Sequence, residues 1–243
     1  MNKKPRHSGL TLTETIVVIS IVAVFTVLGL PAIRAFVRSI ESEGGTKAMI
    51  SASLSSARAM AAQKQRYAGV RFQNKYQPDG KGCQYMIFIV QDPKIMAYGF
   101  RAVEGIAPMK LPDSVGVMEV VGCDSDIDDA TKLANKTTFS VIFSPSGKLV
   151  IHDVQTRNRN GQTNNSSKDD IFNTQSNVQN GIGMFYQDDY PSDGFDKESS
   201  RNSFRIYDKT VFDKVNPLTR YTDYLRTLDV IYINPYTGTI INK

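Results

Sequence analysis

The chain has 243 residues, 41 % of them hydrophobic, and a formal net charge of +5. This length and composition allow one apolar N-terminal segment and one globular domain of roughly 180 residues. The basic residues are scattered among acidic ones and form no stripe with interleaved aromatic residues, so no nucleic-acid partner is expected.

An apolar run near the N-terminus, from Ile16 to Ile33, is the most informative part of the sequence. As a helix this uncharged run would extend roughly 27 Å, close to the ~30 Å hydrocarbon thickness of a bilayer. Because it is apolar on all sides, we predict a transmembrane helix rather than a buried core helix. Lys3, Lys4 and Arg6 precede the run, so the N-terminus is expected in the cytoplasm. A secretory signal peptide is the main alternative.

A single carboxylate, Glu14, stands at the entrance to this run. A carboxylate beside lipid costs up to a few kcal/mol unless it is paired or stays at the interface. No lysine or arginine follows within the run, so a cationic partner would come from elsewhere. The alternative is an interfacial glutamate in contact with water.

The basic leader, Gly9, Glu14 five residues later, the apolar run and Pro31 together resemble the N-terminus of type IV prepilins and pseudopilins. The resemblance implies that a prepilin peptidase cleaves between Gly9 and Leu10 and methylates Leu10. It also implies that Glu14 neutralises the new amino group of a neighbouring subunit and that Pro31 bends the helix. The sequence departs from the family at Leu10, where phenylalanine is usual, and in the threonines that flank Glu14.

The helical pattern continues beyond Pro31 but is interrupted at Gly44 and Gly45, because glycine disfavours helix. A second apolar stripe then follows at Ile50, Leu54, Ala57 and Ala61. We expect one helix from Leu10 to about Gln65, bent at Pro31 and loosened at Gly44, whose second half packs on a sheet. Two separate helices are the alternative.

The rest of the chain is predicted to form strands separated by Gly, Pro, Asn and Asp clusters. The predicted strands cover residues 67–72, 85–90, 97–103, 115–121, 138–143, 148–154, 203–207, 230–233 and 239–242. Hairpin turns are predicted at residues 143–148 and 234–239. The polar composition of residues 155–202 predicts a mobile insertion, with a partner-binding loop as the alternative.

An alanine-rich helix that leads into Tyr67–Phe72, followed by a Phe-Ser-Pro hairpin, is similar to the H-type minor pseudopilins of type II secretion. The predicted fold is α+β and type IV pilin-like: a long N-terminal helix, its N-terminal half transmembrane, packed on antiparallel β-sheets. The predicted organisation is a leader (1–9), a transmembrane helix (10–33), its extramembrane continuation (34–66) and a β-rich domain (67–243) with the flexible insertion 155–202.

Acidic residues at Asp124, Asp126 and Asp128 alternate as in a calcium loop. However, the glycine needed for the sharp turn is missing, and Asn135 stands where an EF-hand has its bidentate glutamate. A solvated loop is therefore predicted, and no metal ion is expected.

Catalytic motifs are missing from the sequence, so neither an enzyme nor a cofactor is expected. Of the two histidines, His7 lies in the leader, and His152 is predicted to be a surface or packing residue. Cys83 and Cys123 either form a disulfide, which an extracytoplasmic location would permit, or remain separate thiols.

These observations predict a minor pilin-like (pseudopilin) subunit, processed by prepilin peptidase and assembled with other pilin or pseudopilin subunits into a type II secretion pseudopilus or a type IV pilus. The expected location is the bacterial inner membrane, in contact with its lipid, with a single pass and a periplasmic C-terminal domain. One alternative is a major filament subunit. Another is a singly anchored periplasmic enzyme or binding protein whose N-terminus matches by chance.

Overall fold

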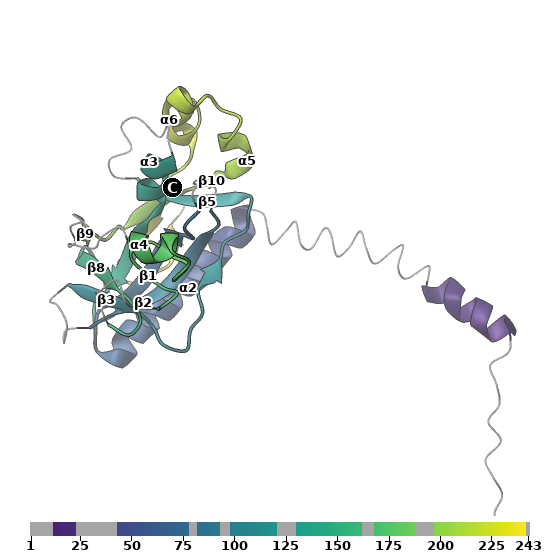
Figure 1. Ribbon diagram of the computed structural model, residues 1–243, viewed down its shortest axis with the longest axis horizontal. Helices are drawn as coiled ribbons and strands as arrows, with labels where there is room; N and C mark the ends of the chain where they lie inside the picture. The colour runs from purple at the N-terminus through teal and green to yellow at the C-terminus, as the bar shows by residue number, and fades with distance from the viewer. Residues whose placement is uncertain are drawn as a thin grey trace, which may run out of the picture.

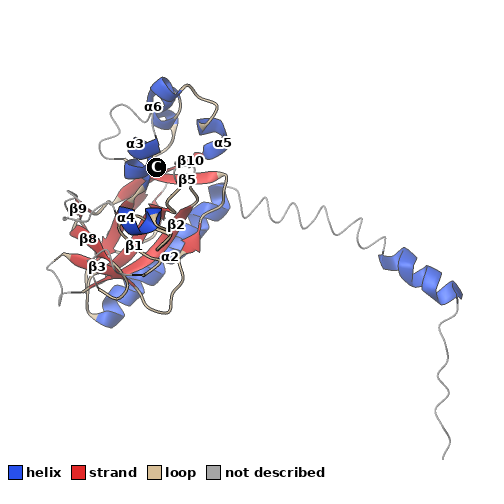
Figure 2. Cartoon of the chain, in the orientation of Figure 1, coloured by secondary structure: helices blue, strands red, loops and turns tan. Residues whose placement is uncertain are grey.

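The computed structural model describes residues 12–22, 43–77, 82–92, 98–120, 130–161, 168–187 and 197–241. From residue 43 onward these residues form two β-sheets and one long helix, α2 (Glu43–Lys64), which lies along the larger sheet (Figure 1). Figure 2 shows α2 in blue against the red strands, with several short helices gathered beside the smaller sheet. A separate helix covers residues 12–22.

The larger sheet has eight strands in the order β7-β6-β1-β2-β3-β8-β9, with β4 paired to β2. Its strands are β1 (Ala68–Asn74), β2 (Gln84–Gln91), β3 (Gly99–Ala102), β4 (Met109–Lys110), β6 (Phe139–Phe143), β7 (Leu149–Val150), β8 (Asp153–Arg157) and β9 (Glu198–Ser199). The smaller sheet has the order β12-β11-β10-β5. Its strands are β5 (Val115–Glu119), β10 (Ser203–Asp208), β11 (Ile231–Ile233) and β12 (Ile240–Ile241).

The remaining helices are short. They are α3 (Ala130–Thr137), α4 (Gln175–Gln179), α5 (Lys209–Phe212), α6 (Arg220–Asp223) and the 3-10 turns η2 (Pro217–Thr219) and η3 (Leu225–Thr227).

The predicted type IV pilin-like fold is contradicted. The helix at residues 12–22 would extend roughly 16 Å, about half of a bilayer core, and no helix within the described ranges is long and apolar enough to cross a membrane. The predicted transmembrane helix and single-pass inner-membrane location are therefore corrected. The larger sheet is also mixed rather than antiparallel, because β3 and β8 pair in parallel. Pro31, the predicted kink, lies outside the described residues.

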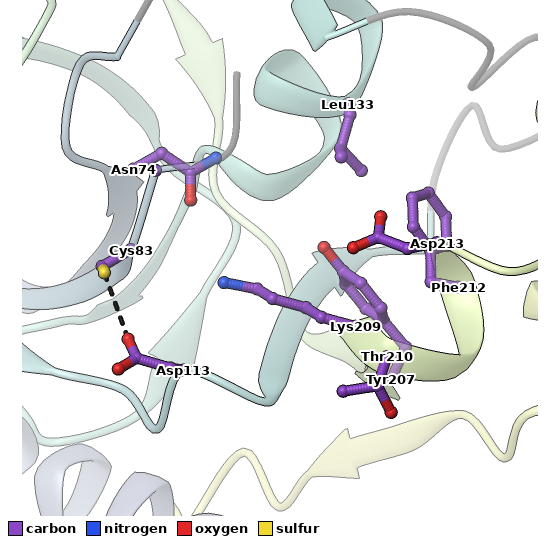
Figure 3. Close-up of a pocket in the computed structure, with 10 residues that line it drawn as sticks. Asn74, Cys83, Asp113, Leu133, Tyr207, Lys209, Thr210, Phe212 and Asp213 are labelled. Atoms are coloured by element: carbon purple, nitrogen blue, oxygen red, sulfur yellow. Dashed lines mark hydrogen bonds between the residues drawn. The ribbon is translucent and has the colours of Figure 1, made fainter. Parts of the chain in front are cut away.

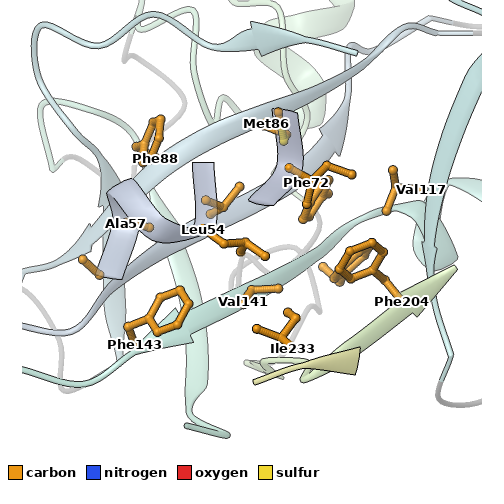
Figure 4. Packing of buried hydrophobic residues seen from close by; sticks show 14 of the residues in the cluster. Leu54, Ala57, Phe72, Met86, Phe88, Val117, Val141, Phe143, Phe204 and Ile233 are labelled. Carbon is orange, nitrogen blue, oxygen red and sulfur yellow. The ribbon is translucent and has the colours of Figure 1, made fainter. Parts of the chain in front are cut away.

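One face of α2 forms the centre of the main hydrophobic core. Its fully buried residues are those of the predicted second stripe, Ile50, Leu54, Ala57 and Ala61. They pack against β1 and β6 and share one core with residues of the smaller sheet (Figure 4). Gly44 and Gly45 fall in the first turn of α2 instead of loosening a longer helix. Alanine at positions 57 and 61 leaves room for the helix to approach the sheet closely.

The centre of β2, residues 86–90, is a continuous apolar run because both faces of the strand are buried. Met86 and Phe88 point toward α2 (Figure 4), whereas Ile87 and Ile89 belong to a second core on the opposite face of the sheet. Successive strand residues point to opposite faces, so burial on both sides produces a continuous apolar run instead of an alternating one.

The second core is closed by part of the segment that was predicted to be mobile. Ile171, Phe172 and Phe185 have at most 2 % of their surface exposed and pack on the sheet. The neighbouring polar residues satisfy the local backbone, since the Thr174 side chain accepts from Asn177 N to cap α4. In the described part of residues 155–202, a few apolar anchors therefore outweigh the polar composition.

The strands β5 and β10 of the smaller sheet are also buried on both faces. Val117 and Phe204 contribute to the α2 core. Met118 and Tyr207 face the other way, into a third core with Phe212 and Leu225 from the short helices. Gly116 makes this packing possible, because a Cβ atom there would lie 2.2 Å from the Tyr207 ring.

Both predicted hairpins are present. Ser144 N donates to Lys148 O at 2.8 Å, and Gly147 adopts φ = +75°, a conformation that glycine accepts readily. In the second turn, Asn234 N donates to Thr239 O at 2.8 Å. The Arg58 Nε atom of α2 donates to Gly147 O at 2.9 Å and so fixes the first hairpin to the helix.

We expect Leu54→Ala to lower the free energy of unfolding by about 2–5 kcal/mol, because it opens a cavity in the α2 core. The matched control is Ser55→Ala, an exposed position on the next residue of α2, with an expected change within about 0.5 kcal/mol. Urea unfolding of the full chain, followed by circular dichroism, measures both variants. Equal unfolding midpoints for the two would contradict the packing described for α2.

Candidate functional site

Most of the residues predicted to carry function lie outside the described residues. These are Gly9 and Leu10 at the predicted cleavage site, Pro31, Cys123, and the acidic residues Asp124, Asp126 and Asp128. Glu14 and Cys83 are described, in different parts of the structure. Within the described ranges no group of three or more histidine, cysteine, aspartate or glutamate residues could hold a metal ion.

Glu14 lies on the helix at residues 12–22, in which every residue is exposed. The exposed apolar side chains are Leu12 (79 %), Ile16, Val17, Val18, Ile19, Ile21 and Val22 (49–62 %). They occur on all sides of the helix, and none of them belongs to a hydrophobic core of the described residues. Contiguous apolar surface of this kind marks an interaction site.

A second candidate site surrounds Cys83, which forms no disulfide with any described residue. The Cys83 Sγ atom donates to Asp113 Oδ1 at 3.1 Å, and the same carboxylate oxygen lies 2.8 Å from Lys110 Nζ. The lysine and the thiol both lower the pKa of Asp113, and the carboxylate in turn raises the pKa of Lys110. Pairing with Cys123 stays a prediction.

The Cys83 thiol lines a pocket of about 410 Å³ between the ends of the two sheets (Figure 3). Its walls come from segments that are distant in sequence: Asn74, Gly82, Cys83, Asp113, Leu133, Tyr207, Lys209, Thr210, Phe212 and Asp213. Leu133 belongs to α3, while Tyr207 and the residues after it come from β10 and α5. Small-molecule sites occupy about 300–1,000 Å³, so the pocket is large enough for a small ligand.

Lys209 is the main charged group inside the pocket. Figure 3 shows its side chain extending toward the wall formed by Cys83 and Asn74. Burial lowers the pKa of its ammonium group, and this effect exceeds the opposing influence of the nearby Cys83, Asp113 and Asp213. A partly desolvated cation in a cavity can bind an anion or, when deprotonated, act as a nucleophile.

The aromatic wall of the pocket is uncharged. Burial raises the pKa of Tyr207, so its phenol remains protonated at neutral pH. The Phe212 ring packs against the Tyr207 ring with centroids 5.2 Å apart. The pocket therefore combines one apolar wall with a cationic group.

Arg71 forms the most deeply buried charge cluster of the described residues, on the face of β1 opposite α2. Its Nη1 atom lies 2.8 Å from Glu198 Oε1, and its Nε atom donates to Gln73 Oε1 at 2.8 Å. Ser140 donates to the same glutamate oxygen, and the guanidinium lies 5.9 Å from the centre of the Phe172 ring. The cluster has a structural role, because it ties β9 and residue 172 to the centre of the larger sheet.

His152, predicted to be a surface or packing residue, packs among aromatic rings. Its ring centre lies 4.3 Å from that of Tyr67 and 5.6 Å from that of Phe100. Its Nδ1 atom is 2.6 Å from Asp153 O, which requires that nitrogen to carry the proton.

Sequence reasoning missed the pocket and Lys209. Nothing distinguishes Lys209 in the sequence from the other lysines, because its setting depends on contacts between residues 74–83, 113, 133 and 207–213. No protein-family model, no curated protein and no solved structure matches the chain. Functional inference therefore depends on the residues and their geometry.

We expect Lys209→Met to raise the melting temperature by about 1–2 °C at pH 7, since it removes a desolvated charge from the pocket. At a pH below the lowered pKa of the folded state, Lys209 is charged in both the folded and the unfolded protein. The folded protein then bears the full desolvation cost of the ammonium group. Between that lowered pKa and the ordinary value of 10.5, the unfolded chain binds more protons, so the unaltered protein gains stability as pH rises.

The difference in melting temperature between Lys209→Met and the unaltered protein should therefore disappear by about pH 10.5. Thermal melts of the full chain from pH 7 to 10.5 test this, with Lys214→Met at an exposed position as the control. A constant difference across this range would show that burial of the ammonium is not its cause.

Proposed function

We propose that the chain is a minor subunit of a pilin-like filament, cleaved by a prepilin peptidase between Gly9 and Leu10. The helix at residues 12–22 would then assemble with the N-terminal helices of other subunits. The observation that carries this proposal is that helix, which is apolar, exposed on all sides and placed just after the predicted cleavage site.

The exposed apolar surface requires several partners rather than one. Burying the exposed half of each of its seven large apolar side chains would contribute about 1 kcal/mol each. A single partner covers one side of a helix, so it would gain about 3–4 kcal/mol, less than the roughly 4–15 kcal/mol that association costs. Helices packed around it on all sides would recover the full amount, as in a helical filament core.

Glu14 would set the register of this packing. It lies at an exposed position of the helix at residues 12–22. Cleavage before Leu10 creates a positive amino group, and in a bundle of parallel helices this group can approach the Glu14 carboxylate of a neighbour. An ion pair shielded from water discriminates strongly against other registers.

The subunit type is supported by the order of the elements that follow. The helix α2 leads directly into β1, and the hairpin that follows β6 contains the Phe-Ser-Pro sequence on which the similarity to H-type minor pseudopilins depends. The domain built on α2 would then be the part of the subunit that is specific to its place in the filament.

We expect Gly9→Leu to block processing, because a bulky side chain at the predicted cleavage site would prevent the peptidase from acting. The intact mass of the protein from its native host should exceed that of the processed form by roughly 1 kDa, the mass of the leader. The control is Ser8→Leu, which places the same side chain one residue earlier and should leave processing largely intact. An unaltered protein that still begins at Met1 would overturn the proposal.

We expect Glu14→Gln to leave cleavage unchanged but to reduce incorporation into filaments at least about tenfold, because the neutral amide cannot pair with the amino group of a neighbour. Thr15→Val, on the next residue, is the control and should assemble normally. Immunoblots that compare sheared filaments with the cell-bound fraction measure the effect. Equal incorporation of both variants would remove Glu14 from the assembly mechanism.

A further inference from the structure

We propose that the pocket between the two sheets binds a small organic carboxylate, with its charged end at Lys209 and its apolar body against Phe212 and Leu133. This site is separate from the N-terminal helix and does not depend on filament assembly. It would give the domain built on α2 a ligand-binding role of its own.

The shape of the pocket supports a small ligand rather than a protein segment. Its volume of about 410 Å³ lies at the lower end of the range of small-molecule sites. Its lining residues come from β1, α3, β10 and α5, from the segments just before β2 and β5, and from the residue just after α5. The walls thus belong to both sheets and to the helices beside them.

The Lys209 ammonium group is the charge in the pocket that favours an anion, because the Asp113 carboxylate belongs to an exposed ion pair. Asp113 is already engaged by Lys110 Nζ at 2.8 Å and by Cys83 Sγ at 3.1 Å. Lys209 forms no ion pair with any described residue, although Cys83, Asp113 and Asp213 lie near enough to favour its charged form. Asp213, which directly follows α5, is exposed, so solvent screens its carboxylate.

The desolvation of Lys209 supports the same conclusion. Burial lowers the pKa of its ammonium group despite two nearby carboxylates, so the unliganded pocket holds this cation at a cost in stability. A bound carboxylate would supply the missing counter-charge, and such a charge-assisted hydrogen bond is among the strong ones. Functional sites commonly retain groups that lower the stability of the folded protein in this way.

The aromatic wall of the pocket favours a ligand whose uncharged part is apolar. Phe212 is 2 % exposed, and Tyr207, whose ring is tilted against it, keeps its neutral phenol at the pocket. Leu133 completes the apolar surface from α3. A carboxylate that carries an aromatic or short aliphatic group matches both ends of the pocket.

The Cys83 thiol provides a direct measurement of occupancy, because it lines the same pocket. The full chain, kept reduced, is treated with N-ethylmaleimide, and the adduct on the Cys83 peptide is followed by mass spectrometry. The probes are 4-phenylbutyrate, its neutral amide, and 4-phenylbutylamine. We expect millimolar 4-phenylbutyrate to slow alkylation of Cys83 at least about fivefold, and the amide and the amine to change it less than twofold.

Substitutions of Lys209 test whether its charge is responsible for the protection of Cys83 by 4-phenylbutyrate. Protection by 4-phenylbutyrate should be lost in Lys209→Met and retained in Lys209→Arg, while the exposed control Lys214→Met should behave like the unaltered chain. Circular dichroism establishes that each variant is folded, and Lys209→Arg tests the proposal should Lys209→Met fail to fold.

Four outcomes would overturn the proposal. Equal protection by the amide would indicate an apolar pocket without charge selection, and stronger protection by the amine would indicate a cation site at Asp213. Protection that persists in Lys209→Met, or its absence with every probe, would exclude Lys209 as the anion contact.

Discussion

Burial of the central strands on both faces is the constraint on which the rest of the structure depends. The strands β1, β2 and β6 receive α2 on one side and residues 168–187 on the other. The smaller sheet joins the same α2 core and is covered on its outer face by the short helices. The pocket lies where the ends of the two sheets meet, so its shape follows from the packing of both sheets.

Such burial leaves no solvent-facing side for the polar residues of β1, which explains the Arg71 cluster. A guanidinium that is fully buried would cost several kcal/mol unless it is paired and hydrogen-bonded. Glu198 supplies the paired charge from a strand more than one hundred residues away in the sequence. The ion pair thus specifies which segment closes that face of the sheet, although a pair of this kind adds little net stability.

The sequence predicted the parts of the fold that depend on local pattern. Strands near residues 67–72, 85–90 and 138–143 are apolar or alternating, and the turn at Gly147 contains typical turn residues. Both could therefore be identified from local sequence, without knowledge of distant contacts. The parallel pairing of β3 with β8 and the packing of residues 168–187 could not, because they depend on contacts distant in the sequence. The membrane prediction was wrong, since no helix in the part of the chain that the structure describes is long and apolar enough to cross a membrane.

The two candidate sites depart, in opposite ways, from the usual burial of apolar side chains and exposure of charged ones. The helix at residues 12–22 exposes apolar side chains that cores normally bury, whereas the pocket partly buries an ammonium group that surfaces normally expose. Each departure costs free energy in the isolated chain, and each would be relieved by a different kind of partner. Apolar helices would cover the first, and a carboxylate would neutralise the second. Departures of this kind concentrate at functional sites, so the proposed assembly and the proposed ligand binding would reside in separate parts of one chain.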